Sequence, residues 1–244
     1  MTIADLAAKI DHTLLKPEAS AADVRQVVAE AVEYRFASVC VHPVWVSGVA
    51  KLLSGTASGV LVCTVVGFPH GANKPTLKAI EATSAIKDGA AEVDVVAQLP
   101  NLIACDLASA KAELIEIVRA ARAARRDVVI KVIVETAALM GLSAEPERSI
   151  ETACRAVRES GCDFIKTSTG FHPAGGATVQ AVRLVKQYAD GIFVKASGGI
   201  RDLSTARAML DAGAHRLGTS AAVAILNELR QGGTVPDPRP TSGN

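Results

Sequence analysis

Aromatic residues are scarce in this sequence of 244 residues, and neither sign of charge is in excess. Phe, Trp and Tyr make up 3% of the chain, and 26 Lys and Arg nearly balance 25 Asp and Glu, for a net charge of +1. Proteins that bind nucleic acid usually have a basic surface, often with aromatic side chains on which bases stack. The composition therefore argues against nucleic acid as a partner.

Long apolar runs are absent as well. Residues 52–73 form the longest stretch without Asp, Glu, Lys or Arg, but Gly, Ser and Thr interrupt it. Its apolar centre, Val60–Val66, is much shorter than the ~20 residues of a membrane-spanning helix. The N-terminus has early acidic residues and no apolar signal-peptide core. We expect a cytoplasmic protein without a membrane partner.

Patterns typical of disulfides, metal sites and nucleotide sites are also missing. The five cysteines are odd in number and include no Cys-x-x-Cys pair, which indicates reduced thiols. The five histidines form no His-x-His or His-Glu-x-x-His motif. Neither glycine-rich signature of dinucleotide or ATP binding occurs. We therefore expect no metal ion and no nucleotide cofactor.

Short runs rich in β-branched residues recur along the chain, roughly one every 30 residues. These runs are Ile10–Leu15, Ser38–Val41, Val60–Val66, Glu92–Val96, Val128–Val134, Phe164–Lys166, Ile192–Lys195 and His215–Leu217. In the segments between these runs, apolar residues recur at the spacing of an amphipathic helix. One example, at i, i+4 and i+7, is Leu114, Val118 and Ala121. Several runs are continuously apolar, as expected of parallel strands buried on both faces.

Eight βα units of about 30 residues are typical of a TIM (β/α)8 barrel. A doubly wound open sheet is the alternative, but the glycine-rich turn that usually follows its first strand is missing after Ile10–Leu15. We predict an α/β fold with one TIM-barrel domain over residues 1–230. A short helix is expected at the N-terminal start of this domain. Residues 231–244, rich in Gly and Pro, are expected to form a flexible tail.

Polar residues within or at the ends of these runs are candidates for chemistry, because barrel active sites lie where strands end. They include Asp11 and Thr13 in the first run, Asp94 in the fourth, Lys131 in the fifth, Lys166 in the sixth and Lys195 in the seventh. Burial and a second cation both lower the pKa of a lysine. A neutral amine can attack a carbonyl carbon and form a Schiff base.

Asp94 is the candidate for acid–base work, since imine chemistry needs a group that both gives and takes a proton. A structural alternative is that each lysine simply pairs with a buried carboxylate such as Asp94 or Asp11. The presence of several lysines and acidic residues at strand ends favours a functional role over a purely structural one, because burying charge costs free energy that a structural pair does not need to spend.

Glycines near the last two strands indicate an anion site. Gly198 and Gly199 follow the seventh run, and Gly218 and Ser220 lie at the eighth, directly before a helical segment. Either glycine group alone would be an ordinary turn. Together they match the phosphate site that barrels build after strands seven and eight.

Six motifs, in this order along the chain, are similar to those of deoxyribose-phosphate aldolases. They are Ile10–Pro17, Val65–Gly71, Glu92–Asp94, Lys131–Thr136, Asp163–Phe171 and Val194–Arg201. The resemblance extends from about residue 3 to 230. It implies a metal-independent Schiff-base aldolase that reversibly cleaves 2-deoxy-D-ribose 5-phosphate to D-glyceraldehyde 3-phosphate and acetaldehyde, in deoxyribonucleotide catabolism.

The same resemblance implies the role of each residue. Lys166 would form the imine, Lys195 would favour its neutral amine, and Asp94 would relay protons. A supporting network and the phosphate end would be formed by Asp11, Thr13, Lys131, Thr169, Gly170, Gly198, Gly199, Gly218 and Ser220. The partner would be a small phosphorylated sugar, and the assembly a homodimer.

Two positions depart from the family pattern. Residues 97–102 differ from the Asn-Ile-Gly-like turn that is common there, and Phe171 replaces a lysine that some members have. Phosphate contacts would then rest more on backbone N–H groups and on Arg201. A lyase acting on another sugar phosphate, and a phosphate-binding protein without turnover, are the alternatives.

Overall fold

The strands form a closed parallel barrel in sequence order, which confirms the predicted TIM-barrel fold. In the computed structural model, which describes residues 1–232, eight strands pair with their sequence neighbours, and β8 pairs with β1. They are β1 (Ile10–Leu14), β2 (Ser38–Val41), β3 (Leu61–Val66), β4 (Glu92–Val96), β5 (Val129–Ile133), β6 (Phe164–Lys166), β7 (Phe193–Ser197) and β8 (Arg216–Thr219).

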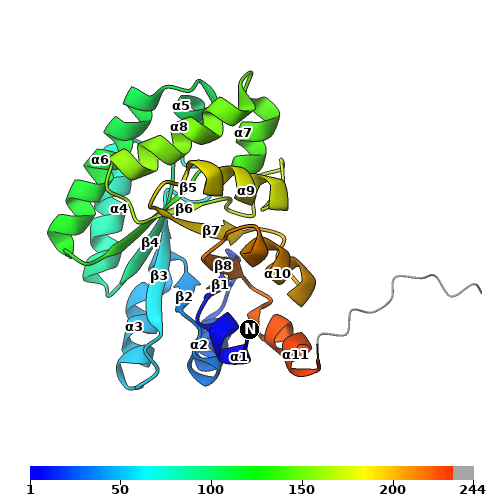
Figure 1. Ribbon diagram of the computed structural model, residues 1–244. Helices are drawn as coiled ribbons and strands as arrows, with labels where there is room; N and C mark the ends of the chain where they lie inside the picture. Colours follow the sequence, from blue (N-terminus) through cyan, green and yellow to red (C-terminus); the bar gives the residue numbers. More distant parts are fainter. Residues whose placement is uncertain (233–244) are drawn as a thin grey trace, which may run out of the picture.

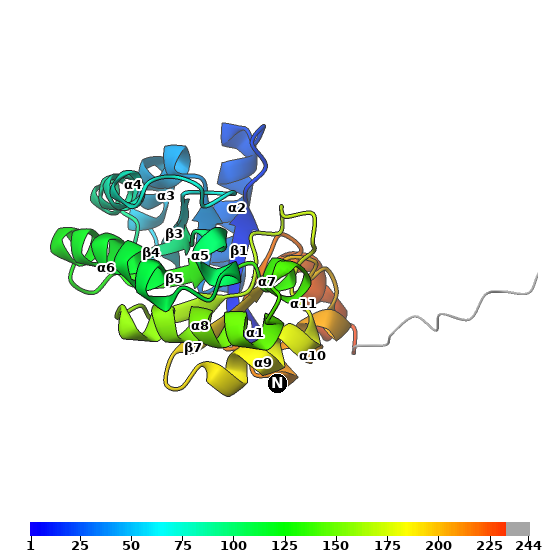
Figure 2. The same cartoon turned by 90° about the horizontal axis from the view of Figure 1, so that it is seen from above.

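Helices surround this barrel, as Figures 1 and 2 show from two directions. They are α1 (Ile3–Ala7), α2 (Ala21–Tyr34), α3 (Val46–Ser54), α4 (Pro75–Lys87), α5 (Leu99–Ile103), α6 (Leu107–Ala124), α7 (Thr136–Leu142), α8 (Pro146–Glu159), α9 (Val179–Tyr188), α10 (Leu203–Asp211) and α11 (Ala222–Arg230), with a 3₁₀ turn at Pro43–Trp45. The predicted N-terminal helix is α1, which packs against α11.

Local sequence explains where several helices begin. Ser20 and Asp23 form a capping box at the start of α2, in which each side chain accepts a hydrogen bond from the other residue's backbone N–H. Thr2 and Asp5 do the same for α1. Side-chain oxygens of this kind satisfy backbone N–H groups that have no partner inside the helix.

The strand boundaries differ slightly from the predicted runs, and one shift affects the site. Strand β7 continues to Ser197, so Lys195 lies in the middle of the strand rather than at its end. Residues 97–102 are not a plain loop, because α5 begins at Leu99, with Pro100 in its first turn. Pro is favoured at that position since its missing N–H is not needed there.

Strand register places the charged residues side by side. Lys166 on β6 is the register partner of Lys195 on β7, and Asp94 on β4 is the partner of Lys131 on β5. Every residue of β4 is buried, and Glu92 and Asp94 alternate with Val93 and Val95, so the polar face of this strand is buried as well as the apolar one. The barrel interior is therefore where the buried charges meet.

None of the helices within residues 1–232 is both long enough and apolar enough to cross a membrane. The described helices and strands run from Ile3 to Arg230. Of the tail predicted at 231–244, residues 233–244 lie outside the described residues.

A buried ion pair fixes the segment that follows β4. Lys78 Nζ on α4 lies 2.6 Å from Glu113 Oε1 on α6 and donates a second hydrogen bond, also 2.6 Å, to the Val96 carbonyl. Glu113 Oε2 accepts from the Gln98 N–H at 3.0 Å. The pair joins two helices to the end of the strand that carries Asp94.

Glu113→Gln should lower the free energy of unfolding by about 3–5 kcal/mol, because it leaves the Lys78 ammonium buried without its counter-charge. Urea unfolding at pH 7 measures this. The matched control is Glu116→Gln, an exposed position on the same helix, which should cost less than about 1 kcal/mol. Equal losses in the two variants would contradict the assignment.

Candidate active site

Seven ionisable side chains meet inside the barrel, and we call them the charged cluster. Its members are Asp11, Glu92, Asp94, Lys131, Lys166, Lys195 and Arg216, which come from β1, β4, β5, β6, β7 and β8. All are at most 3% exposed except Arg216, whose side chain is 15% exposed. Charges this deeply buried need partners, so the geometry of their pairing decides their chemistry.

Asp94 is the centre of the cluster. Its Oδ2 accepts hydrogen bonds from Lys166 Nζ at 2.8 Å and from Lys195 Nζ at 2.6 Å. Its Oδ1 accepts from Lys131 Nζ at 2.9 Å. One carboxylate therefore contacts all three lysines that the sequence singled out.

The other two carboxylates complete the pairing. Asp11 Oδ2 lies 2.5 Å from Lys195 Nζ, and Asp11 Oδ1 accepts from Arg216 Nε at 2.9 Å. Glu92 Oε2 lies 2.6 Å from Lys131 Nζ and accepts from Arg216 Nη2 at 3.0 Å.

Neither Glu92 nor Arg216 was predicted from the sequence as a site residue. The available signal for Glu92 was its position two residues before Asp94, which puts both side chains on one face of a strand.

The cations keep the carboxylates ionised. Burial alone would raise the pKa of Asp94, but Lys131, Lys166 and Lys195 outweigh it and hold that pKa well below its usual value. Burial likewise opposes ionisation of Asp11, and Lys195 and Lys131 overcome it, so its pKa is also lowered. Asp94 is thus a carboxylate in the unliganded protein, ready to accept a proton before it donates one.

The expectation that buried lysines have lowered pKa values is wrong for Lys195 and Lys131. Burial does act in that direction on Lys195, but the carboxylates of Asp11 and Asp94 outweigh it and raise the pKa. The pKa of Lys131 is raised for the same reason, with Asp94 as its strongest partner. Lys195 is therefore a permanent cation whose Nζ shares the Asp94 oxygen with Lys166.

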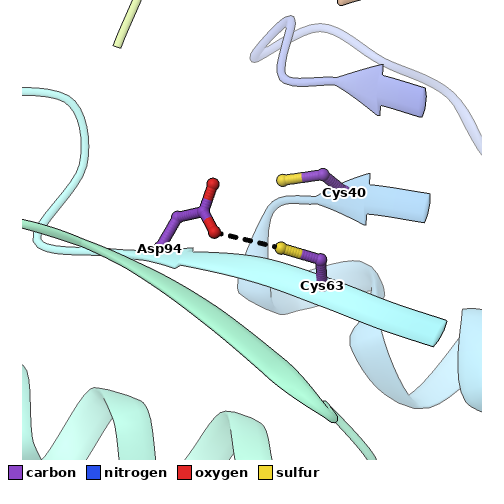
Figure 3. A group of neighbouring side chains, drawn as sticks. All are labelled: Cys40, Cys63 and Asp94. Carbon is purple, nitrogen blue, oxygen red and sulfur yellow. Dashed lines mark hydrogen bonds between the residues drawn. The ribbon is translucent and has the colours of Figure 1, made fainter. Parts of the chain in front are cut away.

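Two thiols lie beside the cluster. Cys63 Sγ on β3 is 3.3 Å from Asp94 Oδ1 and 3.3 Å from Lys131 Nζ, and Cys40 is its register partner on β2 (Figure 3). The hydrogen bond from Cys63 lowers the pKa of Cys40, whereas burial raises the pKa of Cys63. Both thiols are fully buried.

A cavity of about 230 Å³ opens above the cluster at the carboxyl ends of the strands. Of the predicted site residues, it is lined by Thr13, Lys166, Thr169, Gly170, Gly198, Gly199, Gly218 and Ser220. Asp11, Asp94, Lys131 and Lys195 do not line it and lie beneath it. Further lining residues include Ser197, Arg201 and Phe171. Lys166 alone among the three candidate lysines reaches both the cavity and Asp94.

Two of the lining glycines leave little room for a side chain. Gly198 has φ +86°, and a Cβ there would lie 2.9 Å from the Gly176 Cα. A Cβ on Gly218 would lie 3.0 Å from Ser197 Cβ and 3.1 Å from Lys195 Cε, so these side chains would have to move by a few tenths of an ångström. Gly218 therefore both borders the cavity and makes room for the cluster.

Comparison with known proteins agrees with this geometry. A family model described as DeoC/LacD family aldolase matches residues 6–229. The chain belongs to the DeoC/LacD aldolase family. It is therefore an aldolase, which is a lyase.

Among its relatives is the deoxyribose-phosphate aldolase of Mycobacterium avium, 47% identical, with 93% of this chain and 98% of the relative covered. The enzyme of the same name from Caldanaerobacter subterraneus is 45% identical, with 95% and 96% covered. The solved deoxyribose phosphate aldolase of Aeropyrum pernix, described as a tetramer, is 35% identical, covers 94% of this chain and 92% of its own, and has a TM-score of 0.84. The homodimer stays a prediction.

Acid should destabilise the protein through the cluster. Because Asp94 and Asp11 have lowered pKa values, they stabilise the fold above about pH 4, and that stabilisation is lost as the pH falls towards their folded values. Each such group contributes up to about 1.4 kcal/mol per pH unit. Between pH 5 and 3, Asp94→Asn should therefore show a shallower fall in unfolding free energy than the unchanged protein.

Urea unfolding at each pH measures this fall. Asp211→Asn, at an exposed position on α10, serves as the control and should keep the original slope. The same slope in Asp94→Asn as in the unchanged protein would mean that Asp94 does not carry the acid sensitivity.

Proposed function

We propose that this aldolase is a metal-independent Schiff-base enzyme that reversibly cleaves 2-deoxy-D-ribose 5-phosphate to D-glyceraldehyde 3-phosphate and acetaldehyde, within deoxyribonucleotide catabolism. The observation that carries the proposal is the Lys166 amine at the floor of a cavity, 2.8 Å from the buried Asp94 carboxylate. The names of the relatives support the choice of substrate.

Lys166 is the least strongly paired of the four basic side chains in the charged cluster. The charged cluster contains four potential cations and three carboxylates, so it is balanced when one cation is lost. Lys131, Lys195 and Arg216 each lie within 3.0 Å of carboxylate oxygens of two different residues, whereas Lys166 contacts only Asp94 among the described residues. Lys166 therefore has the fewest ion pairs of the four cations, and a carbonyl carbon can engage its amine with the least disruption of the cluster.

Imine formation follows from this geometry. The neutral Lys166 Nζ attacks C1 of the open-chain sugar, and the carbonyl oxygen takes up a proton to give a carbinolamine. Loss of that oxygen as water leaves an iminium ion. Asp94 accepts the proton released by the nitrogen and returns one to the departing hydroxyl. The cationic Lys195 Nζ, hydrogen-bonded to the same oxygen of Asp94, orients that oxygen.

The iminium ion then acts as an electron sink for carbon–carbon cleavage. The C3 hydroxyl loses its proton, the C2–C3 bond breaks, and its electron pair moves into an enamine on Lys166. Glyceraldehyde 3-phosphate leaves. Protonation of the enamine at C2 and hydrolysis of the resulting imine release acetaldehyde and the free lysine. The reverse sequence joins the two aldehydes.

The phosphate group would bind at the end of the cavity opposite Lys166. Gly170, Gly198 and Gly199 line it there without side chains, so backbone N–H groups can approach an anion. Ser220 lies two residues before α11, whose N-terminus favours negative charge. The guanidinium of Arg201 adds a formal positive charge.

Borohydride should trap acetaldehyde as an N-ethyl group on Lys166, because reduction converts the imine into a stable secondary amine. Mass spectrometry of a digest, on protein dialysed against EDTA, locates the adduct. Lys166→Met should abolish it and lower the cleavage rate by at least about 10³-fold. The control is Lys16→Met, an exposed lysine on the rim of the same cavity, which should keep both the adduct and turnover.

Four results would overturn this account. An adduct on another residue contradicts the role of Lys166, and activity that is lost on EDTA dialysis contradicts the absence of a metal. An adduct on Lys166 without cleavage of deoxyribose 5-phosphate would favour a lyase for another sugar phosphate. No adduct and no cleavage would favour a phosphate-binding protein.

Arg201→Gln should raise KM for 2-deoxyribose 5-phosphate roughly 10- to 100-fold, the effect of losing one charge-assisted hydrogen bond. KM for unphosphorylated 2-deoxyribose should change little. Steady-state kinetics on both sugars tests this, with Arg207→Gln as the control, because Arg207 is exposed on α10 and does not line the cavity. An equal rise for both sugars would remove Arg201 from the phosphate site.

A further inference from the structure

Two thiols and a carboxylate converge at one point that the reaction uses only in part. Cys40 and Cys63 are register partners on β2 and β3, and Cys63 Sγ is 3.3 Å from Asp94 Oδ1 on β4. The two Sγ atoms and a carboxylate oxygen all lie within 4.8 Å of one another (Figure 3). The proposed aldol cleavage needs Asp94 but has no role for either thiol.

This donor set suits a soft or borderline divalent cation. Zinc binds Cys at about 2.3 Å and carboxylate at about 2.0–2.2 Å, in tetrahedral geometry. Those bond lengths place two sulfurs about 3.8 Å apart and a sulfur and an oxygen about 3.6 Å apart. The observed spacing, at most 4.8 Å, exceeds these distances by no more than about 1.2 Å, so binding needs only a modest approach of the three side chains.

We propose that Cys40, Cys63 and Asp94 form a binding site for a zinc-class divalent cation, and that its occupation inhibits the aldolase. The site is inhibitory rather than catalytic, because the bound cation would engage the carboxylate that serves Lys166 and Lys195. The cation-binding part of the proposal is independent of the proposed reaction.

A divalent cation can bind close to the lysines of the charged cluster because its binding leaves the net charge unchanged. Each thiol loses its proton when it ligates a metal. Two protons leave as one divalent cation enters, so the net charge of the region does not change. Lys131 Nζ, 3.3 Å from Cys63 Sγ, then faces a thiolate in place of a thiol, which offsets part of its repulsion from the metal.

A second group of possible ligands overlaps this one and is less suitable. Asp11, Cys63 and Glu92 also lie within 4.8 Å of one another. Both of their carboxylates, however, are already paired with Arg216 and with a lysine. A cation there would disturb five ion pairs and gain one thiolate, whereas a cation at Asp94 disturbs three ion pairs and gains two thiolates, so the two-thiol site is favoured.

The cation must enter from the substrate cavity. The two cysteines pack in a small apolar cluster with Leu15 and against Phe68. Leu15 also lines the cavity. A displacement of this side chain would open the way from the cavity to the thiols, so ligands that fill the cavity should slow the entry of metal.

Cd²⁺ is the probe, because each cadmium–thiolate bond adds ultraviolet charge-transfer absorbance. The experiment uses the full chain with Cys105→Gly, which removes a partly exposed thiol at a backbone position of φ +55° that glycine tolerates. We expect one Cd²⁺ per chain, with the absorbance of two thiolates. Cys63→Ser, of nearly equal volume, should halve this absorbance and weaken binding at least tenfold, as should Cys40→Ser.

Cys162→Ser is the matched control, since Cys162 is a buried cysteine outside the barrel interior. It should keep the full absorbance. The proposal is overturned if the background protein shows no thiolate absorbance, or if Cys40→Ser and Cys63→Ser bind Cd²⁺ as it does. The background protein is itself decisive, so poor folding of a variant does not leave the question open.

Inhibition is measured in a separate experiment. For each variant, the rate of 2-deoxyribose 5-phosphate cleavage with Zn²⁺ is divided by the rate of the same variant without Zn²⁺. The ratio should fall at least tenfold in the background protein, recover on addition of EDTA, and stay near one in Cys63→Ser. Bound Cd²⁺ with no effect of Zn²⁺ on the rate would refute the inhibitory role. Because the absorbance needs no substrate, failure of the proposed aldol reaction would leave the binding result intact.

Discussion

The pairing of three buried carboxylates with the cations of the barrel interior is the constraint on which this structure depends. A buried charge without a partner costs several kcal/mol, so neither Lys195 nor Asp94 could remain charged here alone. Each carboxylate instead contacts at least two cations, and Asp94 contacts three. The closed barrel makes this possible, because it brings side chains from six strands to one interior.

Depth in the barrel separates the roles of three similar lysines. Lys131 and Lys195 lie beneath the cavity and are held as cations by carboxylates on more than one side. Lys166 lies at the boundary, where one side of its amine faces Asp94 and the other faces the cavity. An amine can be a nucleophile only where a carbonyl carbon can reach it, so position favours Lys166 as the proposed nucleophile.

Features that depend on periodicity along the chain were predictable from the sequence. Side-chain pairs that depend on which strands meet across the barrel were not. All eight strands were predictable, because short runs of strand-forming residues recur roughly every 30 residues, and the positions of Lys166, Lys195 and Asp94 within those runs identified them as candidates. Glu92 and Arg216 were not identified, since their pairing spans 124 residues and depends on the closure of β8 onto β1. The same closure brings Asp11 to Lys195, which is why burial alone gave the wrong direction for the pKa of that lysine.

The shared carboxylates also join stability to chemistry. Arg216 does not line the cavity that Lys166 reaches, yet it binds one oxygen of Asp11. The other oxygen of Asp11 contacts Lys195, which in turn shares Asp94 with Lys166. A change at Arg216 therefore redistributes charge along the whole chain of contacts, and its effect should not add to that of a change at Asp11. The cysteines enter at the same point, since a cation held by Cys63 and Asp94 would act on Lys166 through the carboxylate that orients it. In this barrel the residues that make burial of charge tolerable are the ones that would prepare the proposed reactive amine, so a substitution that alters one property should alter the other.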